Sequence, residues 1–358
     1  MNKCLAVLAF VFLMCGQANA QFSTTFAKNA SPGQQAGFYY SLPQTVLQLD
    51  FLIEESELVE GPFSNYASRY LGSADMVEFD GKEYKIVDVT MHCNADPDPN
   101  ATFFVALGSG RGSAKVDFDI LPNGIIRSVS LGNAVDDGYQ PAPAPTVEKP
   151  GAPEPKRASS QFINMAASGK STDQLAKEAA DKIEEIRKAK FNLLSGFYEV
   201  AYDKETLDDM FQRLDEMEAE YVSLFSGKRI TKQVVKSVYV IPVKDIPTMT
   251  VAKFSESEGL TIGTSGIGSP ITVQALPLNN LGTVNAPSQS AIESMTYESK
   301  VIYRVPDMAN IKVMMGRNVL LEKRVGVNQL GQMLMAPVTN TRLIFNTETG
   351  QITNLRMY

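Results

Sequence analysis

The segment VLQLDFLIEE (residues 46–55) combines β-branched and aromatic residues with a partial alternation of apolar and polar positions. This composition and period are typical of a half-buried β-strand. YKIVDVTM (84–91) has the same character, and TFFVALG (102–108) is a short apolar run. These three segments predict that the fold is mostly β with α+β elements.

The residues on either side of these strands predict a small N-terminal α+β domain over 37–137. AKVDFDILPNGIIRSVSLG (114–132) is typical of a hairpin, with Asn123 and Gly124 in its turn. GPFSNYASRYLG (61–72) places its aromatic residues at helical spacing, which predicts a helix between two strands.

A proline-rich segment follows this predicted domain. GYQPAPAPTVEKPGAPEPKRASS (138–160) contains six prolines and almost no large apolar side chain. Such a composition cannot bury enough surface to fold and favours extended polyproline conformations. We therefore predict a semi-rigid linker that divides the chain into two parts.

The second part begins with two predicted helices. Apolar residues recur at three- or four-residue spacing from Leu175 to Leu193 and from Leu207 to Phe225. This pattern predicts an antiparallel helical hairpin over 161–232. Residues 233–358 then contain short β-rich segments separated by Gly, Pro and Asn, which is typical of an antiparallel β-sandwich or barrel.

The first twenty residues have the composition of a signal peptide. Lys3 precedes an apolar run of about ten residues, too short for a membrane span, and the small residues Ala18-Asn19-Ala20 follow. We expect cleavage between Ala20 and Gln21, and export to the periplasm or outer membrane of a Gram-negative bacterium. Lipidation of Cys15 is the alternative, although Met14 and Phe12 fit a lipobox poorly.

Charge and cysteine content exclude several classes of function. Without residues 1–20 the chain has 32 basic and 40 acidic residues, a net charge of −8. An acidic chain without a basic cluster is a poor binder of nucleic acid or anionic lipid. We therefore expect no nucleic-acid partner, and no transmembrane span after signal removal. Only Cys93 remains, so packing alone must hold the core.

The segment MHCNADPDPN (91–100) contains the only histidine of the chain, His92, beside Cys93. Its acidic residues resemble the start of a calcium loop, but Ala101 and Leu107 stand where that loop needs Gly and Glu. Zinc would need a second pair of ligands at suitable spacing. We therefore predict a solvated turn here, with no metal site and no cofactor.

No catalytic motif is evident elsewhere. The chain has no nucleophile elbow, and a Ser–His–Asp triad would have to use His92. A hydrolase of glycan or peptide that uses carboxylates remains the alternative, because such acids follow no local spacing rule. The densest acids lie between Asp208 and Glu220, on the predicted polar face of a helix, where solvation explains them. We assign no catalytic residue.

Several motifs occur in an order that resembles a known family. They include GFYYSLPQTVLQLDFLIEE, GPFSNYASRYLG, EAEYVSLFSGK, VIYRVPDMANIKV and NQLGQMLMAP. The chain resembles an uncharacterised full-length family of secreted envelope proteins, a domain of unknown function, from Bacteroides-type Gram-negative bacteria. The resemblance implies an exported location and brings no activity. The motif positions, without assigned roles, are Tyr40, Pro43, Gly61, Pro62, Tyr66, Tyr70, Gly72, Phe225, Gly227, Phe254, Gly259, Tyr303, Arg304, Pro306, Gln329, Gly331 and Gly350.

The two parts also contain an internal echo. Tyr40–Pro43 and Tyr303–Pro306 each precede a predicted strand, and hairpins at Asn123-Gly124 and Thr349-Gly350 follow. Coincidence and duplication both remain open, because such turns are common. If duplication holds, each Pro-led segment should start a small antiparallel unit. We expect the helix at 61–72 to cover the first unit and the helical hairpin to cover part of the second.

These observations predict an exported protein that binds or scaffolds an envelope protein or glycan without catalysis.

Overall fold

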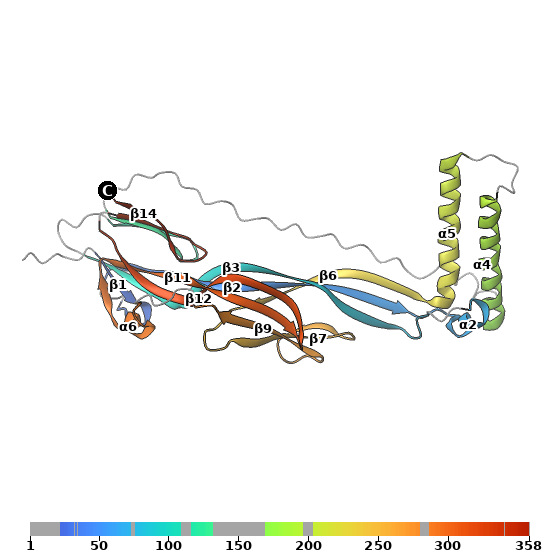
Figure 1. Cartoon of the computed structure of the whole chain (residues 1–358), viewed down its shortest axis with the longest axis horizontal. Helices are drawn as coiled ribbons and strands as arrows, with labels where there is room; N and C mark the ends of the chain where they lie inside the picture. The colour runs from blue at the N-terminus through green and yellow to red at the C-terminus, as the bar shows by residue number, and fades with distance from the viewer. Residues whose placement is uncertain are drawn as a thin grey trace, which may run out of the picture.

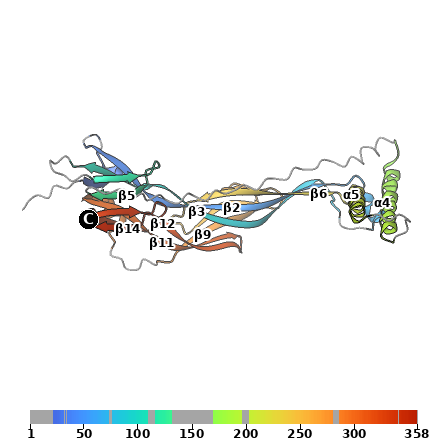
Figure 2. The ribbon, with the colours of Figure 1, turned by 90° about the horizontal axis from the view of Figure 1, so that it is seen from above.

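A computed structural model describes residues 22–31, 33, 35–72, 76–108, 116–131, 169–195, 203–279, 286–339 and 341–357. The molecule is elongated, with a β-sheet body at one end and two upright helices at the other (Figures 1 and 2). The fold is mostly β with α+β elements, which confirms the predicted class. The predicted signal peptide (1–20) and the predicted linker (138–160) lie outside the described residues.

The first sheet is built around one very long hairpin. Its strand order is β10-β1-β3-β2-β6, and all pairs are antiparallel. The bounds are β10 (Thr296–Glu298), β1 (Phe22–Phe26), β3 (Gly81–Leu107), β2 (Gly37–Val59) and β6 (Lys228–Val240). A 3-10 turn, η1 (Ala27–Asn29), follows β1.

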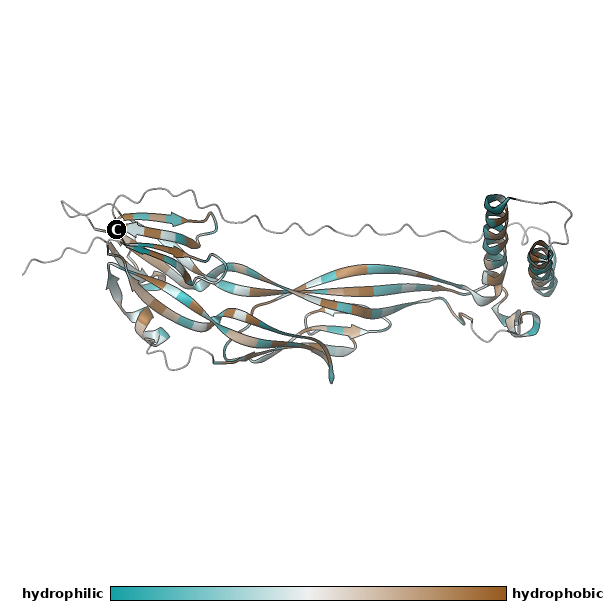
Figure 3. Ribbon diagram, turned by 45° about the horizontal axis from the view of Figure 1, so that its top comes forward, coloured by the Kyte–Doolittle hydropathy of each residue, from teal (hydrophilic) through white to brown (hydrophobic). Residues whose placement is uncertain are grey.

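The second sheet packs against the first. Its order is β12-β11-β9-β7-β8. The bounds are β12 (Asn318–Pro337), β11 (Lys300–Met315), β9 (Ser269–Pro277), β7 (Thr248–Ser255) and β8 (Gly259–Ile262). Alternation places Leu47, Leu49 and Phe51 of β2 on one face, and these residues share a buried cluster with Ile311 and Val313 of β11. Figure 3 shows hydrophobic and hydrophilic bands alternating along these strands.

A third sheet closes the body at the end away from the helices (Figure 1). Its order is β14-β13-β5-β4. The bounds are β14 (Ile352–Met357), β13 (Thr341–Phe345), β5 (Ile126–Leu131) and β4 (Val116–Ile120). Val129 and Leu343 join Tyr40 and Phe103 in a second buried cluster, which also includes Ile292 of the short helix α6 (Gln289–Ser294).

Some of the short β-rich segments predicted within 233–358 join into longer strands. KVIYRVP (300–306) and NIKVMM (310–315) both lie in β11, and NVLLEKRVGV (318–327) and QMLMAP (332–337) both lie in β12. The pairing of β11 with β12 shifts register between Val305 and Asp307. Pro306 lies in this bulge, where the ladder needs no backbone N–H donor, so the proline does not interrupt the strand. Local sequence patterns did not predict that the strand continues through Pro306.

The strand pairing joins the two parts that we expected the segment 138–160 to separate. β2 pairs with β6, and β5 pairs with β13, so strands from before and after this segment are neighbours in two sheets. β1 likewise pairs with β10. Backbone hydrogen bonds between strands therefore cross the predicted boundaries at 137 and 161. The long strand β2 has one neighbour, β3, in the N-terminal part and finds its other neighbour, β6, in the C-terminal part.

This pairing makes a specific prediction about a nicked chain. Limited proteolysis should cut first between Gly138 and Ser160, because a Pro- and Ala-rich composition favours exposed chain. The two fragments should nevertheless elute together in gel filtration and part only in denaturant, since β2 and β6 pair from Leu47 to Val59. Fragments that separate without denaturant, or first cuts within 207–225, would contradict this expectation.

A helical head lies at the far end of the molecule (Figure 1). The predicted hairpin is present as α4 (Thr172–Leu194) and α5 (Lys204–Ser226). A capping box between Ser171 and Gln174 begins α4. The predicted helix at 61–72 is shorter, a 3-10 turn η2 (Ser64–Tyr66) followed by α2 (Ala67–Tyr70). We use "head" for these four elements.

The head is attached through a stalk of three strands, residues 53–59, 81–86 and 228–234. On the stalk, Glu55 of β2 binds Lys82 of β3 at 3.3 Å and Lys232 of β6 at 3.2 Å. Arg229 and Glu83 form a further ion pair at 2.7 Å across the intervening strand. Cross-strand pairs of this kind stabilise a ribbon that has little core of its own.

The strand pairing repeats around the two echoed segments, although both segments lie within strands, β2 and β11, and do not precede them as predicted. In the first hairpin, Leu42 alone lies opposite the four residues 98–101, because Ser41 pairs with Thr102 and Pro43 with Pro97. In the second hairpin, Pro306 alone lies opposite the four residues 328–331. Both first strands also occupy the same place in their sheets, in β3-β2-β6 and in β12-β11-β9.

The closing hairpins contact the echoed segments in the same way. The Ser41 amide donates to the Gly124 carbonyl at 2.8 Å, and the Arg304 amide donates to the Gly350 carbonyl at 3.3 Å. The expected covering roles of the helices are wrong, because α2, α4 and α5 pack on one another in the head. β11 and β12 are linked by two residues, Gly316 and Arg317, whereas the stalk and head extend the corresponding end of the first hairpin.

Candidate functional site

The only histidine lies on the outer face of the first sheet. Register places Gln48 between His92 and Tyr239, and directly opposed residues of neighbouring strands share one face. Asp50, two residues further along β2, lies beside Ser237 on that face. The opposite face of these strands packs into the body, so the row of polar side chains faces solvent.

These polar side chains are joined by hydrogen bonds. The Asn94 amide donates to Gln48 Oε1 at 3.1 Å, and Gln48 Nε2 donates to Asp50, 3.0 Å from each carboxylate oxygen. The Ser237 hydroxyl donates to Asp50 Oδ1 at 2.5 Å. His92 Nε2 lies 3.8 Å from Asp50 Oδ2. Asp50 is therefore the centre of a network drawn from all three strands.

The order of contacts in this network does not match a serine hydrolase. A catalytic triad needs the serine hydroxyl on the histidine and the histidine on the carboxylate. Here Ser237 and His92 both approach Asp50, so the carboxylate stands between the serine and the imidazole. The serine hydroxyl donates to the carboxylate, in place of the imidazole that is the base of a triad.

The prediction of a solvated turn at 91–100 is wrong. The segment lies within β3, and Met91 to Pro97 pair with β2. A long antiparallel partner accommodates Pro97 beside a bulge, where the ladder is already interrupted. Neighbouring residues of a strand point to opposite faces, and accordingly His92 opposes Gln48 whereas Cys93 opposes Leu47. Burial raises the pKa of the Cys93 thiol, which lowers its thiolate fraction.

Replacing both residues tests whether this segment holds a metal. His92→Ala with Cys93→Ala should leave the metal content of the purified protein unchanged, since the two side chains leave β3 on opposite faces. We expect a loss of stability of about 1 kcal/mol in urea unfolding. Elemental analysis that finds stoichiometric zinc in the wild type, lost in the double variant, would contradict this prediction.

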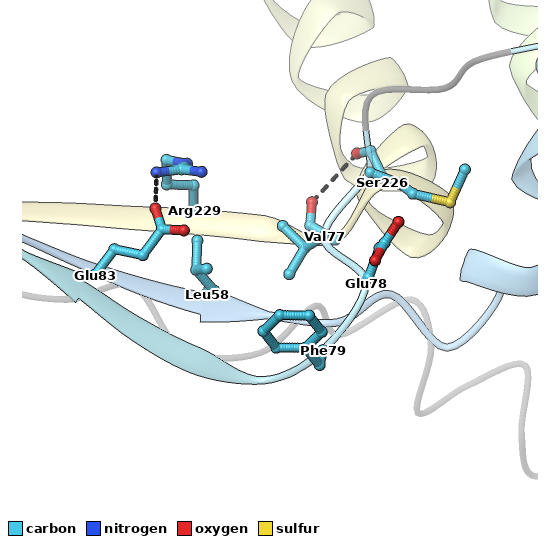
Figure 4. Close-up of a pocket in the computed structure, with 9 residues that line it drawn as sticks. Leu58, Val77, Glu78, Phe79, Glu83, Ser226 and Arg229 are labelled. Atoms are coloured by element: carbon cyan, nitrogen blue, oxygen red, sulfur yellow. Dashed lines mark hydrogen bonds and ion pairs between the residues drawn. The ribbon is translucent and has the colours of Figure 1, made fainter. Parts of the chain in front are cut away.

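A cleft of about 360 Å³ lies where the stalk meets the head (Figure 4). Val77 donates its amide to the Ser226 carbonyl at 2.9 Å, which holds the segment before β3 against the end of α5. Arg229 and Glu83, the ion pair described above, form the charged side of the cleft, and the exposed ring of Phe79 lies beside it. The lining residues are Leu58, Met76, Val77, Glu78, Phe79, Glu83, Ser226, Gly227 and Arg229.

Many motif positions meet at one place in the body, which we call the central joint (residues 40–45, 97–98, 302–306, 328–331 and 350). The buried Tyr40 hydroxyl donates to the Ile302 carbonyl and accepts from its amide, both at 3.1 Å, and burial raises the pKa of this phenol. Arg304 donates to the Pro43 carbonyl and to Asp98 Oδ2, both at 2.9 Å.

The contacts of the central joint are reciprocal. Asp98, from the four-residue excursion of the first hairpin, binds Arg304 on the first strand of the second hairpin. Gln329, from the matching excursion of the second hairpin, binds both the amide and the carbonyl of Thr45 at 2.9 Å. Gly331 is required here, because a Cβ would lie 1.9 Å from the Val305 carbonyl oxygen. Each hairpin therefore contributes a side chain that is hydrogen-bonded to the other hairpin.

A second group of motif positions anchors the head. Tyr70 and Phe63 pack on Phe225, with ring centroids 6.5 and 5.5 Å away. A Cβ at Gly61 would lie 2.5 Å from the Leu224 carbonyl oxygen, and one at Gly227 would lie 2.5 Å from that of Val59. The anchor therefore depends on close backbone contact between the end of α5 and the end of the stalk.

Two further motif positions, Phe254 and Gly259, also lie in structural contacts. Phe254 is buried in the body, and Gly259, with φ +75°, lies against the ring of Tyr84 at the β7–β8 turn. The sequence did not single out Asp98, Thr45 or Gln48 as contact residues. The nearest available signal was the Asp-Pro repeat around Asp98, which we interpreted as a turn.

Among the described residues, no three His, Cys, Asp or Glu side chains are grouped closely enough to hold a metal ion. In the same part of the chain, no helix combines the length and apolar character of a membrane span.

Residues 36–353 match a family model described as a domain of unknown function (DUF4831). No curated protein and no solved structure matches the chain at significant similarity.

Proposed function

The chain belongs to this family of unknown function, and we propose that it is an exported, non-catalytic binding or scaffolding protein of the cell envelope. In this proposal the body and stalk act as a rigid support, and the helical head is the part that is held out toward a partner. The sequence features that support export are Lys3, the apolar run and Ala18–Ala20.

The observation that carries the proposal is the position of the head. Figure 1 shows α4 and α5 rising from the end of the stalk, away from the body. Among the described residues, the head meets the stalk through the base of α5 and the residues packed around Phe225. Apolar side chains near the other end of α4 stay exposed, with Phe191 at 69% and Leu194 at 74%. Exposed apolar side chains do not stabilise the folded chain, so contact with a partner is the better explanation for their exposure.

The motif positions support the same interpretation. Most of them lie in the central joint or in the head anchor, and these contacts hold the parts of the molecule in fixed relation. A binding support needs such rigidity, whereas catalysis needs groups that converge on a reacting atom.

Site-specific photo-crosslinking in cells tests the role of the head. A photoreactive residue replaces Glu184, whose side chain is 71% exposed on α4, and in a matched variant it replaces Val319, which is 52% exposed in the body. We expect a discrete adduct in the envelope fraction from position 184 alone, competed by excess unlabelled wild-type protein. Equal adducts from both positions, or none from position 184, would contradict the proposal.

The same envelope preparation tests export. N-terminal sequencing of the isolated protein should begin at Gln21. A lipid on Cys15 would overturn the cleavage site and leave export intact, whereas recovery only from the cytoplasm would overturn export itself.

A further inference from the structure

The network around Asp50 forms a preorganised polar face. The face consists of Gln48, Asp50, His92, Asn94, Ser237 and Tyr239. Asp50 is held by donors from two neighbouring side chains, and its own side chain is only 17% exposed. The groups at the two edges remain open to solvent, with the His92 side chain at 55% and Tyr239 at 64%.

Two features distinguish this face from an ordinary solvated sheet surface. First, Gln48 and Asp50 are fixed by one another and by Asn94 and Ser237, so their remaining hydrogen-bonding capacity points in defined directions. Second, Tyr239 lies directly beside Gln48 on the edge strand β6, and most of the tyrosine is exposed to solvent. A fixed polar row beside a free aromatic ring is the arrangement that binds a ligand carrying both hydroxyl groups and apolar C–H groups.

We propose that this polar face binds a neutral glycan chain. The inference goes beyond the proposed role of the head, because it assigns a ligand, and no reaction, to a face of the body. Sugar hydroxyl groups donate to the carboxylate and amide oxygens of Asp50, Gln48 and Asn94, and accept from the amide nitrogens. The C–H face of a sugar ring stacks on Tyr239.

Charge and shape select this class of ligand. The Asp50 carboxylate and the net charge of −7 disfavour acidic polysaccharides. The three strands β3, β2 and β6 present an open sheet face, which suits an extended chain better than a small molecule that needs enclosure. A second copy of the protein is a less suitable partner for this face, because the Asp50 carboxylates of the two copies would lie against each other and repel.

Affinity electrophoresis in native gels provides the test. The probes are soluble neutral polysaccharides (a mannan, a xylan, a β-glucan and dextran), with polygalacturonic acid as the acidic comparison. We expect at least one neutral polymer to slow the wild-type protein. Tyr239→Ala should lower the association constant about tenfold, from loss of the stacking contact. Tyr239→Phe should keep most of the retardation, and Gln48→Ala should lose it.

Tyr39→Ala is the matched control, because Tyr39 is 45% exposed on β2 and lies outside the polar face, against Phe104. It should migrate like the wild type in every gel, and urea unfolding should show that all variants fold. The proposal is overturned if no neutral polymer slows the protein, if only the acidic polymer does, or if Tyr239→Ala is retarded as strongly as the wild type. A dimer that Tyr239→Ala abolishes would also overturn it, in favour of self-association.

The two proposals fail separately. Crosslinking at position 184 reports on the head, and glycan retardation reports on a face of the body. Adducts at the head without glycan binding would support the scaffolding role and overturn the proposal that the polar face binds a glycan.

Discussion

Arg304→Met should destabilise the protein by about 3–5 kcal/mol, because it leaves the Asp98 carboxylate buried without its partner. Both side chains of the pair are 7% exposed, and Arg304 also satisfies the Pro43 carbonyl at 2.9 Å. Burial lowers the pKa of the Arg304 guanidinium, and the nearby Asp98 carboxylate opposes this change. The shift in the urea unfolding midpoint measures the loss.

A double variant separates the unpaired charge from the general loss of packing. Arg304→Met with Asp98→Leu removes both charges, and replacing a buried ion pair by apolar residues is often close to neutral. The double variant should therefore recover a large part of the stability that the single variant loses. A single variant that costs less than about 1 kcal/mol, which is an ordinary substitution, would show that the central joint does not depend on this ion pair.

Gly227→Ala should loosen the head without unfolding the body. Gly227 has φ +76°, and an added Cβ would lie 2.5 Å from the Val59 carbonyl oxygen and 2.9 Å from the Val77 Cβ. The left-handed backbone and the overlap together should cost about 3 kcal/mol. Amide hydrogen exchange should show faster opening of α5 near Phe225, while β2 and β11 in the body keep their protection.

Gly72→Ala is the matched control for this variant. Gly72 has φ +60° and would meet no atom within 4 Å of a Cβ, so only the conformational cost applies. We expect about 1 kcal/mol from it and little change in the exchange of α5. If the two variants behave alike, the close contact between Gly227 and the stalk does not anchor the head.

Local patterns were sufficient for much of the secondary structure. The alternation in VLQLDFLIEE identified a strand, the spacing from Leu175 to Phe225 identified the helical hairpin, and Asn123-Gly124 identified a turn. The echo between Tyr40–Pro43 and Tyr303–Pro306 was also visible in the sequence, although both segments lie within strands and do not precede them. These features depend on neighbours a few residues away in the chain.

The pairing between strands that are distant in the chain could not be predicted from local patterns. Nothing near Leu47 indicates that its partner is Val240, and nothing near the Asp-Pro repeat indicates that Asp98 binds Arg304. The candidate polar face has the same origin, since His92, Asp50 and Ser237 come from three strands.

The sequence by itself determined the mostly β class, the helical hairpin, the turns, and the absence of a recognisable catalytic motif. Only the tertiary structure decided that strands from both sides of residues 138–160 share sheets, that 91–100 is a strand, and that the helices form a separate head. The physical reason is that periodicity fixes which face of an element is apolar, while many partners can cover that face. Burial of the whole chain selects among those partners, and here it selected two hairpins that lock each other through Asp98, Arg304 and Gln329.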